Sequence, residues 1–176
     1  MEQPAELLQQ FAHGDLDAFE SLFRQFQGEV FRWIVRIVRD PGIAEDLTIE
    51  TFWRIHRAWA RFDPGRSFAA WARRIATNVA LDHLKTSRLE VELPEELPAA
   101  ALPNPGIEQD VRERVGQAFR QLPVKLRVAA TLALIEEEPY QEIADALGIS
   151  VGAVKLRVFR AVRLLRKQLQ QMGVKP

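Results

Sequence analysis

The fold is decided by residues 139–167, which read PYQEIADALGISVGAVKLRVFRAVRLLRK. In this stretch Ile143 and Leu147 lie on one face of a short helix. Gly148 suits the left-handed position that ends a helix, and Ser150 is a favourable N-cap for the helix that follows. Two helices joined by such a tight turn predict a helix-turn-helix, the motif whose second helix fits the DNA major groove.

The second helix, expected over residues 151–170, has one apolar face and one basic face. Apolar residues at helical spacing should face the domain interior: Val151, Val154, Val158, Ala161 and Leu165. From Lys155 to the C-terminus the chain has seven basic residues and no acidic one. Charge of a single sign favours contact with DNA phosphates. The alternative is an ordinary solvated helix face.

Charge changes sharply along the chain, although the formal net charge is zero. Residues 89–110 contain six acidic side chains and no basic one, whereas residues 111–176 contain twelve basic and six acidic ones. Four prolines, which do not fit helix interiors, lie in the acidic part: Pro94, Pro98, Pro103 and Pro105. We therefore interpret residues 89–106 as a flexible acidic linker between two domains, at 1–88 and 107–176.

Both halves show helical periodicity and neither shows strand-like alternation, so the sequence predicts an all-α protein. Asp15 or Asp17 is expected to cap the first long helix, and breaks are expected at Asp40-Pro41-Gly42 and Asp63-Pro64-Gly65. In the second half the expected helices span 107–121, 123–137, 140–147 and 151–170.

Several classes of protein are disfavoured by composition. The chain has no run of 18 apolar residues and no signal-peptide pattern, which predicts a cytoplasmic protein without membrane insertion. It has no cysteine, its three histidines are scattered, and it contains no phosphate-binding loop or nucleophile motif. We therefore expect no enzyme activity, metal or cofactor.

Motifs from both halves resemble one family. In the second half they are Glu142-Ile143-Ala144, Leu147-Gly148-Ile149 and residues 152–161. In the first half they are Ala44-Glu45-Asp46-Leu47, Glu50-Thr51-Phe52, Phe68-Ala69-Ala70-Trp71, residues 74–78 and Asp82-His83-Leu84. Together they resemble domains 4 and 2 of the extracytoplasmic-function class of bacterial RNA polymerase sigma factors. The resemblance covers nearly the whole chain, in the order of that family.

The resemblance implies that the second helical run of the first half docks on a coiled coil of the largest polymerase subunit. The matching positions are Asp46, Glu50, Trp53, Arg54 and Arg57. For the two acids, which are four residues apart, ordinary surface ion pairs with neighbouring arginines are the alternative. The implied partners are core RNA polymerase, through this coiled coil and its flap region, promoter DNA and an anti-sigma factor.

The same resemblance places recognition and melting of the −10 promoter element on the next loop and helix, where a base is flipped into a pocket. The matching residues are Arg66, Ser67 and Phe68 of the loop and Asn78 of the helix, and Arg73 and Arg74 are expected to hold phosphates. Trp71 shares a helix face with Phe68 and Ile75, which favours a core position over a stacking platform for a base.

Recognition of the −35 element is implied for the final helix. The matching residues are Lys155, Leu156, Arg157, Phe159, Arg160 and Arg163. Arginine pairs with guanine edges or with phosphate, and Phe159 is placed to touch a thymine methyl group, or else to pack on its own domain. The linker either crosses the polymerase active-site cleft and RNA exit path or is a plain spacer.

The sequence departs from the family at three positions. Ile49 replaces a usual Gln, which puts one polar contact with polymerase in doubt. Ala153 replaces a usual Thr, and Leu156 replaces a usual Ser. A leucine in the groove adds apolar contact and removes a hydrogen-bonding group, so we expect an altered −35 preference.

Three rival functions remain at this point: a dimeric DNA-binding regulator that works without polymerase, an enzyme and a protein scaffold. The domain-2-like half argues against the regulator. Asp82-His83 is the strongest feature for an enzyme and is an isolated pair on a helix. The basic final helix has no role in a scaffold.

Overall fold

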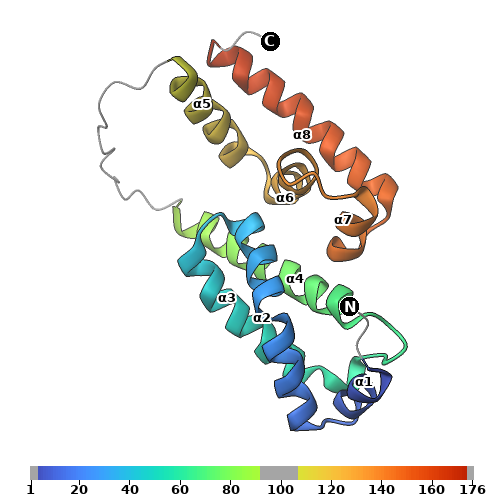
Figure 1. Cartoon of the computed structure of the whole chain (residues 1–176). Coiled ribbons are helices and arrows are strands. Elements are labelled where there is room, and N and C mark those ends of the chain that lie inside the picture. The colour runs from blue at the N-terminus through green and yellow to red at the C-terminus, as the bar shows by residue number, and fades with distance from the viewer. Residues whose placement is uncertain (1–3, 92–106, 174–176) are drawn as a thin grey trace.

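The computed structural model describes residues 4–91 and 107–173, with side chains placed except at 88–91, 107–110 and 112. Every regular element in these ranges is a helix, which confirms the predicted all-α class (Figure 1). In chain order they are α1 (Ala5–Ala12), α2 (Leu16–Val38), α3 (Pro41–Arg57), the 3₁₀ turn η1 (Trp59–Arg61), α4 (Phe68–Val91), α5 (Ile107–Gln121), α6 (Val124–Ala130), the π-helical turn η2 (Thr131–Ile135), α7 (Tyr140–Leu147) and α8 (Val151–Gln171).

Side-chain caps set the starts of the long N-terminal helices. The Asp15 carboxylate accepts the backbone N–H of Ala18 at 2.8 Å, so Asp15 is the N-cap of α2. Asp40 caps α3 in the same way, through the backbone N–H of Ile43 at 3.0 Å. The predicted break at residues 40–42 is therefore a cap followed by the first helical turn, because proline is well suited to that first turn.

Two expected boundaries differ from the structure. α4 continues to Val91, beyond the predicted domain end at residue 88, and the rest of the predicted linker, 92–106, lies outside the described residues. The expected helix over 123–137 is divided, because α6 passes into η2, where the Glu136 N–H donates to the Thr131 carbonyl at 3.1 Å. This i to i+5 bond widens the last turn.

An aromatic core holds the loop between η1 and α4 against α1 and α2. The Phe68 ring lies 5.6 Å from Phe11 and 5.0 Å from Phe26, measured between centroids. Phe62 lies 5.5 Å from Phe11 and 5.0 Å from Trp71. The rings pack in tilted or edge-to-face arrangements at these separations, so both ends of the loop are held against the core.

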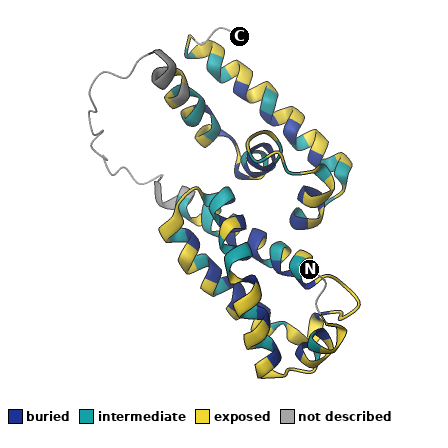
Figure 2. Cartoon of the chain, in the orientation of Figure 1, coloured by how far each residue is buried: buried dark blue, intermediate teal, exposed yellow. Residues whose placement is uncertain are grey.

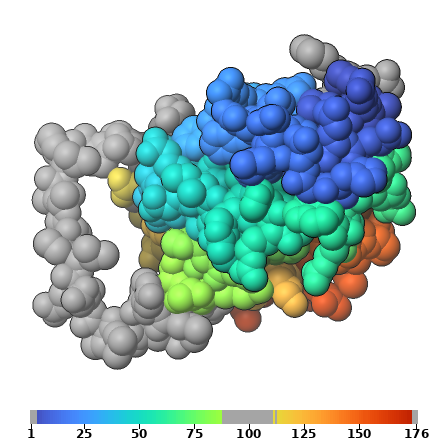
Figure 3. Space-filling view, turned by 90° about the horizontal axis from the view of Figure 1, so that it is seen from below, coloured from blue at the N-terminus to red at the C-terminus, as the bar shows by residue number. Residues whose placement is uncertain are grey.

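The two halves of the chain pack against each other. One continuous apolar cluster includes buried residues of α2 and α4 together with buried residues of α6, η2 and α7. α4 contacts both α6 and α7, and α2 contacts η2 (Figures 1 and 2). A smaller cluster lies between α5, α6 and α8. Figure 3 shows the first half covering the view, with parts of the second half along its lower edge.

Candidate nucleic-acid interface

The structure forms the predicted helix-turn-helix from α7 and α8. Gly148 ends α7 in the left-handed region, at φ 64°. The Ile149 N–H then donates to the Ala144 carbonyl at 3.0 Å. The Ser150 hydroxyl accepts the backbone N–H of Ala153 at 3.2 Å and caps α8. Gly148 therefore ends the first helix and Ser150 caps the second, as predicted.

α8 divides into a buried face and an exposed face. Val154, Val158, Ala161 and Leu165 are buried, as predicted. The opposite face is exposed and contains Lys155, Leu156, Phe159, Arg160 and Arg163. Phe159 is 59% exposed, so most of its ring is accessible to a partner. Arg157 is partly buried and lies at the edge of this face.

The cations of α8 have no carboxylate partner among the described side chains. Six basic residues lie on this helix: Lys155, Arg157, Arg160, Arg163, Arg166 and Lys167. None of them forms an ion pair with a described side chain. An uncompensated row of cations produces a positive surface that favours polyanions.

The loop before α4 is rigid and partly polar. The Asp63 carboxylate accepts the Gly65 N–H at 2.9 Å and pairs with Arg66 at 3.3 Å. The Ser67 hydroxyl accepts the Ala70 N–H at 3.3 Å, which caps α4. Arg66 and Ser67 are exposed, as a contact to DNA requires.

The predicted contact between Phe68 and the −10 DNA is wrong. Its side chain is 0% exposed and lies in the aromatic core. It cannot reach DNA while the fold is intact, because its position is fixed by ring packing on several sides. Helical periodicity places Phe68 in the core, and that interpretation, rather than its place in the family motif, is the correct one.

Arg73 and Arg74 are adjacent on α4, and Asn78 lies one turn after Arg74. Asn78 is exposed. Arg73 pairs with Glu29 at 2.9 Å and with Glu142 of α7 at 2.6 Å. The guanidinium of Arg74 lies against Gly148, with a nitrogen 2.9 Å from where a Cβ on that glycine would be. Both arginines therefore contact the helix-turn-helix.

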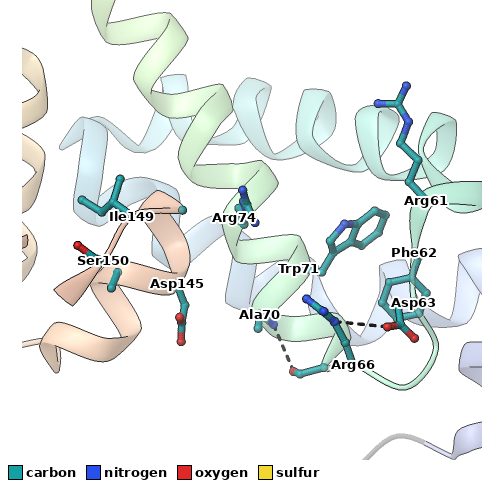
Figure 4. Close-up of a pocket in the computed structure, with 13 residues that line it drawn as sticks. Arg61, Phe62, Asp63, Arg66, Ala70, Trp71, Arg74, Asp145, Ile149 and Ser150 are labelled. Atoms are coloured by element: carbon teal, nitrogen blue, oxygen red, sulfur yellow. Dashed lines mark hydrogen bonds and ion pairs between the residues drawn. The ribbon is translucent and has the colours of Figure 1, made fainter. Parts of the chain in front are cut away.

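An open cavity of about 730 Å³ lies between the loop, α4 and α7 (Figure 4). Trp71 is partly exposed there while its ring also packs on Phe62 and Phe68, so it belongs to both the core and the cavity wall. The remaining lining is mixed: Arg61, Phe62, Asp63, Arg66, Ser67, Ala70, Arg74, Ala144, Asp145, Gly148, Ile149 and Ser150.

A second exposed surface runs along α3. Ile49 and Trp53, one turn apart, are 67% and 54% exposed, and the Arg57 guanidinium lies 4.6 Å above the Trp53 ring. Arg54 pairs with Glu50 at 2.7 Å and with Asp82 at 3.4 Å. The hydrogen bond that Arg54 donates to the Glu50 carboxylate raises the pKa of Arg54 despite partial desolvation.

The two acids predicted on this surface differ. Glu50 forms the ordinary i, i+4 ion pair with Arg54 that was the alternative interpretation. Asp46 is exposed and pairs with no described side chain. An unpaired carboxylate beside an exposed tryptophan fits a contact surface better than a structural ion pair does.

Two models of conserved sequence families match the chain, Sigma-70 region 2 at residues 22–90 and Sigma-70, region 4 at residues 112–165. The chain is 34% identical to the RNA polymerase sigma factor CarQ of Myxococcus xanthus, over 94% of this chain and 97% of that protein. It is 28% identical to the ECF RNA polymerase sigma factor SigW of Bacillus subtilis, over 94% and 96%.

The chain belongs to the extracytoplasmic-function family of RNA polymerase sigma factors. It therefore directs promoter-specific initiation of transcription by RNA polymerase. Its fold is similar to that in the structure of CnrH in complex with the cytosolic domain of CnrY, at a TM-score of 0.59 and 26% identity, over 95% of this chain and 97% of that one. Across the described ranges, no helix has the length and apolarity that a bilayer crossing needs.

Sequence reasoning about this sigma factor missed the contacts between region 2 and region 4. Arg36 of α2 bonds Glu138, 102 positions away, and Arg73 bonds Glu142, 69 positions away. Local patterns cannot reveal pairs so distant in sequence. The sequence shows only that the arginines of region 2 and the glutamates of region 4 have opposite charges and lie outside the predicted apolar helix faces.

Proposed function

We propose that α8 reads the −35 element with its exposed face. The observation that carries this proposal is a row of cations that form no ion pair with a described side chain, interrupted by the exposed side chains of Leu156 and Phe159. Arg160 and Arg163 supply donors for guanine edges or phosphates, and the two apolar side chains suit thymine methyl groups. The cap at Ser150 fixes where the helix begins and therefore which residues reach the groove.

We also propose that the loop over residues 63–67, together with α4, recognises and opens the −10 element. A flipped base needs a pocket with apolar walls and a few polar groups, and the residues that the loop and α4 contribute to the cavity beside Trp71 provide both. Arg66 and Ser67 supply polar groups there, and we propose that Arg73, Arg74 and Asn78 of α4 contact the DNA strand. Phe68 supports the loop from within.

We infer that α3 docks on the coiled coil of the largest polymerase subunit. The exposed Trp53, with Arg57 stacked on it, is the type of anchor that dominates protein interfaces. Asp46, Glu50 and Arg54 supply polar contacts around it. Ile49, in place of the usual glutamine, extends the apolar part of the surface.

Regulation by an anti-sigma factor is part of the same proposal. It is supported by the similarity to CnrH, which was solved with the cytosolic domain of CnrY. We propose that the chain acts in the cytoplasm, where polymerase and promoters are found, and that it has no catalytic activity, because chemistry is performed by the polymerase.

The proposal is tested by co-migration of the purified protein with bacterial core RNA polymerase in a density gradient, followed by run-off transcription from a promoter library. We expect a complex and transcripts from promoters that share one −35/−10 pair. If the protein bound DNA but not core polymerase, the assignments on α3 would be contradicted. A DNA-binding regulator that works without polymerase would then explain the sequence better.

A second prediction concerns Leu156. Replacing it with Ser removes apolar contact and adds a hydrogen-bonding group, so we expect the preferred base at one −35 position to change, with a roughly tenfold shift in relative promoter strength. The matched control is Leu164→Ser, two turns along the same helix and also exposed. An unchanged −35 preference in the Leu156 variant would exclude a base contact by this residue.

A further inference from the structure

The loop over residues 63–67 places no side chain of its own in the core. All five side chains are exposed. The Arg66 N–H donates to the Asp63 carbonyl at 2.9 Å, and this bond closes a turn within the loop without holding the loop on the protein. Its place is therefore set by the residues at its two ends, Phe62 and Phe68, which are 6% and 0% exposed.

Phe11 of α1 contacts both ends of the loop. Its ring is 1% exposed and lies 5.5 Å from Phe62 and 5.6 Å from Phe68, measured between centroids. It also lies 6.1 Å from Trp71, which lines the cavity proposed for the −10 base. α1 itself lies beside the loop that leads into α4 (Figure 1). Because protein interiors are closely packed, a shift of this one ring displaces the loop ends and the cavity wall together.

A second contact joins α1 to the first end of the loop, at Gly14. This glycine has a φ of 85°, and its N–H donates to the Phe11 carbonyl at 2.9 Å, which closes the end of α1. The Trp59 indole covers it so closely that an added Cβ would lie 3.2 Å from a ring atom. Trp59 begins η1, and its carbonyl accepts the Phe62 N–H at 3.0 Å. The position of α1 is therefore passed through Trp59 to the start of the loop.

We propose that Phe11 and Gly14 are positioning residues for promoter opening, because they set the place of the loop over residues 63–67. This inference rests on the proposed role of that loop at the −10 element. Both residues precede the part of the chain that matches Sigma-70 region 2. The exposed Trp53 on α3 stacks on Arg57 and takes no part in these contacts. Substitutions in α1 should therefore slow opening of the promoter and leave affinity for core polymerase unchanged.

The place of the loop is measured directly with a nitroxide label and electron paramagnetic resonance. The chain has no cysteine, so Arg66→Cys provides a single attachment point on the loop of the full chain. We expect restricted motion of the label in the parent and faster motion after Phe11→Leu, which removes the shared ring. Gly14→Ala should have the same effect, because its Cβ displaces the Trp59 indole. Unchanged label motion in both α1 variants would overturn the proposal.

Each variant has a matched control elsewhere in the chain. Gly173→Ala makes the same change at a φ of 77°, where the nearest atom to an added Cβ is 3.7 Å away. Phe23→Leu removes a ring that packs on Phe52 of α3, at 4.8 Å between centroids. Both controls should leave the label motion unchanged, and circular dichroism verifies that every variant is folded. Controls that loosened the loop as much as the α1 variants do would overturn the proposal, because the effect would then be a general loss of stability.

Promoter opening is followed by a fluorescent adenine analogue in the −10 element, mixed with polymerase that contains each variant and the native Arg66. We expect Phe11→Leu and Gly14→Ala to open the promoter roughly tenfold more slowly, since a displacement of about 1 Å in positioning groups can cost up to about 100-fold in rate. Their affinity for core polymerase should equal that of the parent. A promoter with a mismatched, already open −10 region should restore most of the transcription. Loss of affinity for core polymerase in both variants would overturn the proposal.

The double variant Arg66→Ala with Ser67→Ala separates this inference from the proposed function, because it alters the loop and leaves α1 intact. If it slows opening while the α1 variants change neither label motion nor opening, positioning by α1 fails and the −10 assignment stands. If the α1 variants loosen the loop while opening stays at the parental rate in them and in the double variant, the −10 assignment fails and the contact between α1 and the loop stands.

Discussion

Replacing Phe68 with Ala is expected to destabilise the protein by about 3–5 kcal/mol and to abolish transcription at growth temperature. The side chain is fully buried, and its ring packs on Phe11, Phe26, Phe62 and Trp71. Removing the ring leaves a cavity that the interlocked neighbours cannot fill completely. Domains of this size have about 5–15 kcal/mol of total stability, so the loss is a large fraction of it.

The measurement is thermal unfolding followed by circular dichroism, where we expect Tm to fall by roughly 10 °C. Phe159→Ala is the matched control, because it makes the same chemical change at a side chain that is 59% exposed. That variant should keep its Tm and lose affinity for −35 DNA instead. A Phe68 variant that kept its Tm but lost −10 recognition would restore Phe68 as a direct DNA contact.

The helix-turn-helix was predictable because each of its determinants is local. Gly148 and Ser150 end and begin helices through their own backbone and side-chain geometry, within three residues of their partners. Val154, Val158, Ala161 and Leu165 are buried because helical spacing puts them on one face. Asp15 follows the same rule at the start of α2. For these elements the sequence alone was sufficient.

What escaped prediction depends on contacts between distant segments. Ion pairs join Arg36 of α2 to Glu136 and Glu138, which follow η2, and nothing in either segment indicates the other. The same limit explains Arg73, which was assigned to DNA phosphate because it lies beside the residues that match the family. In the structure it is held between Glu29 and Glu142. A resemblance to a family can indicate which residues contact DNA in the complex with a promoter. It does not indicate which residues they contact within the free chain.

Replacing Trp53 with Ala is expected to weaken binding to core polymerase by roughly 30-fold or more, since a tryptophan anchor at an interface is worth about 2 kcal/mol or above. Trp53 is 54% exposed, and its ring stacks on the Arg57 guanidinium. Among the described residues, it does not pack with the rings of the aromatic core. Its removal should therefore leave stability almost unchanged, because surface substitutions alter it by about 0.5 kcal/mol or less.

The affinity is measured by titrating labelled protein with core polymerase, with Leu16→Ala as the control at an exposed apolar residue away from α3. The control should bind as the parent does. A Trp53 variant that bound core polymerase as tightly as the parent would exclude this ring as the polymerase contact. A variant that lost affinity but kept its Tm would place that contact on α3 itself, because the exposed ring contributes little to folding.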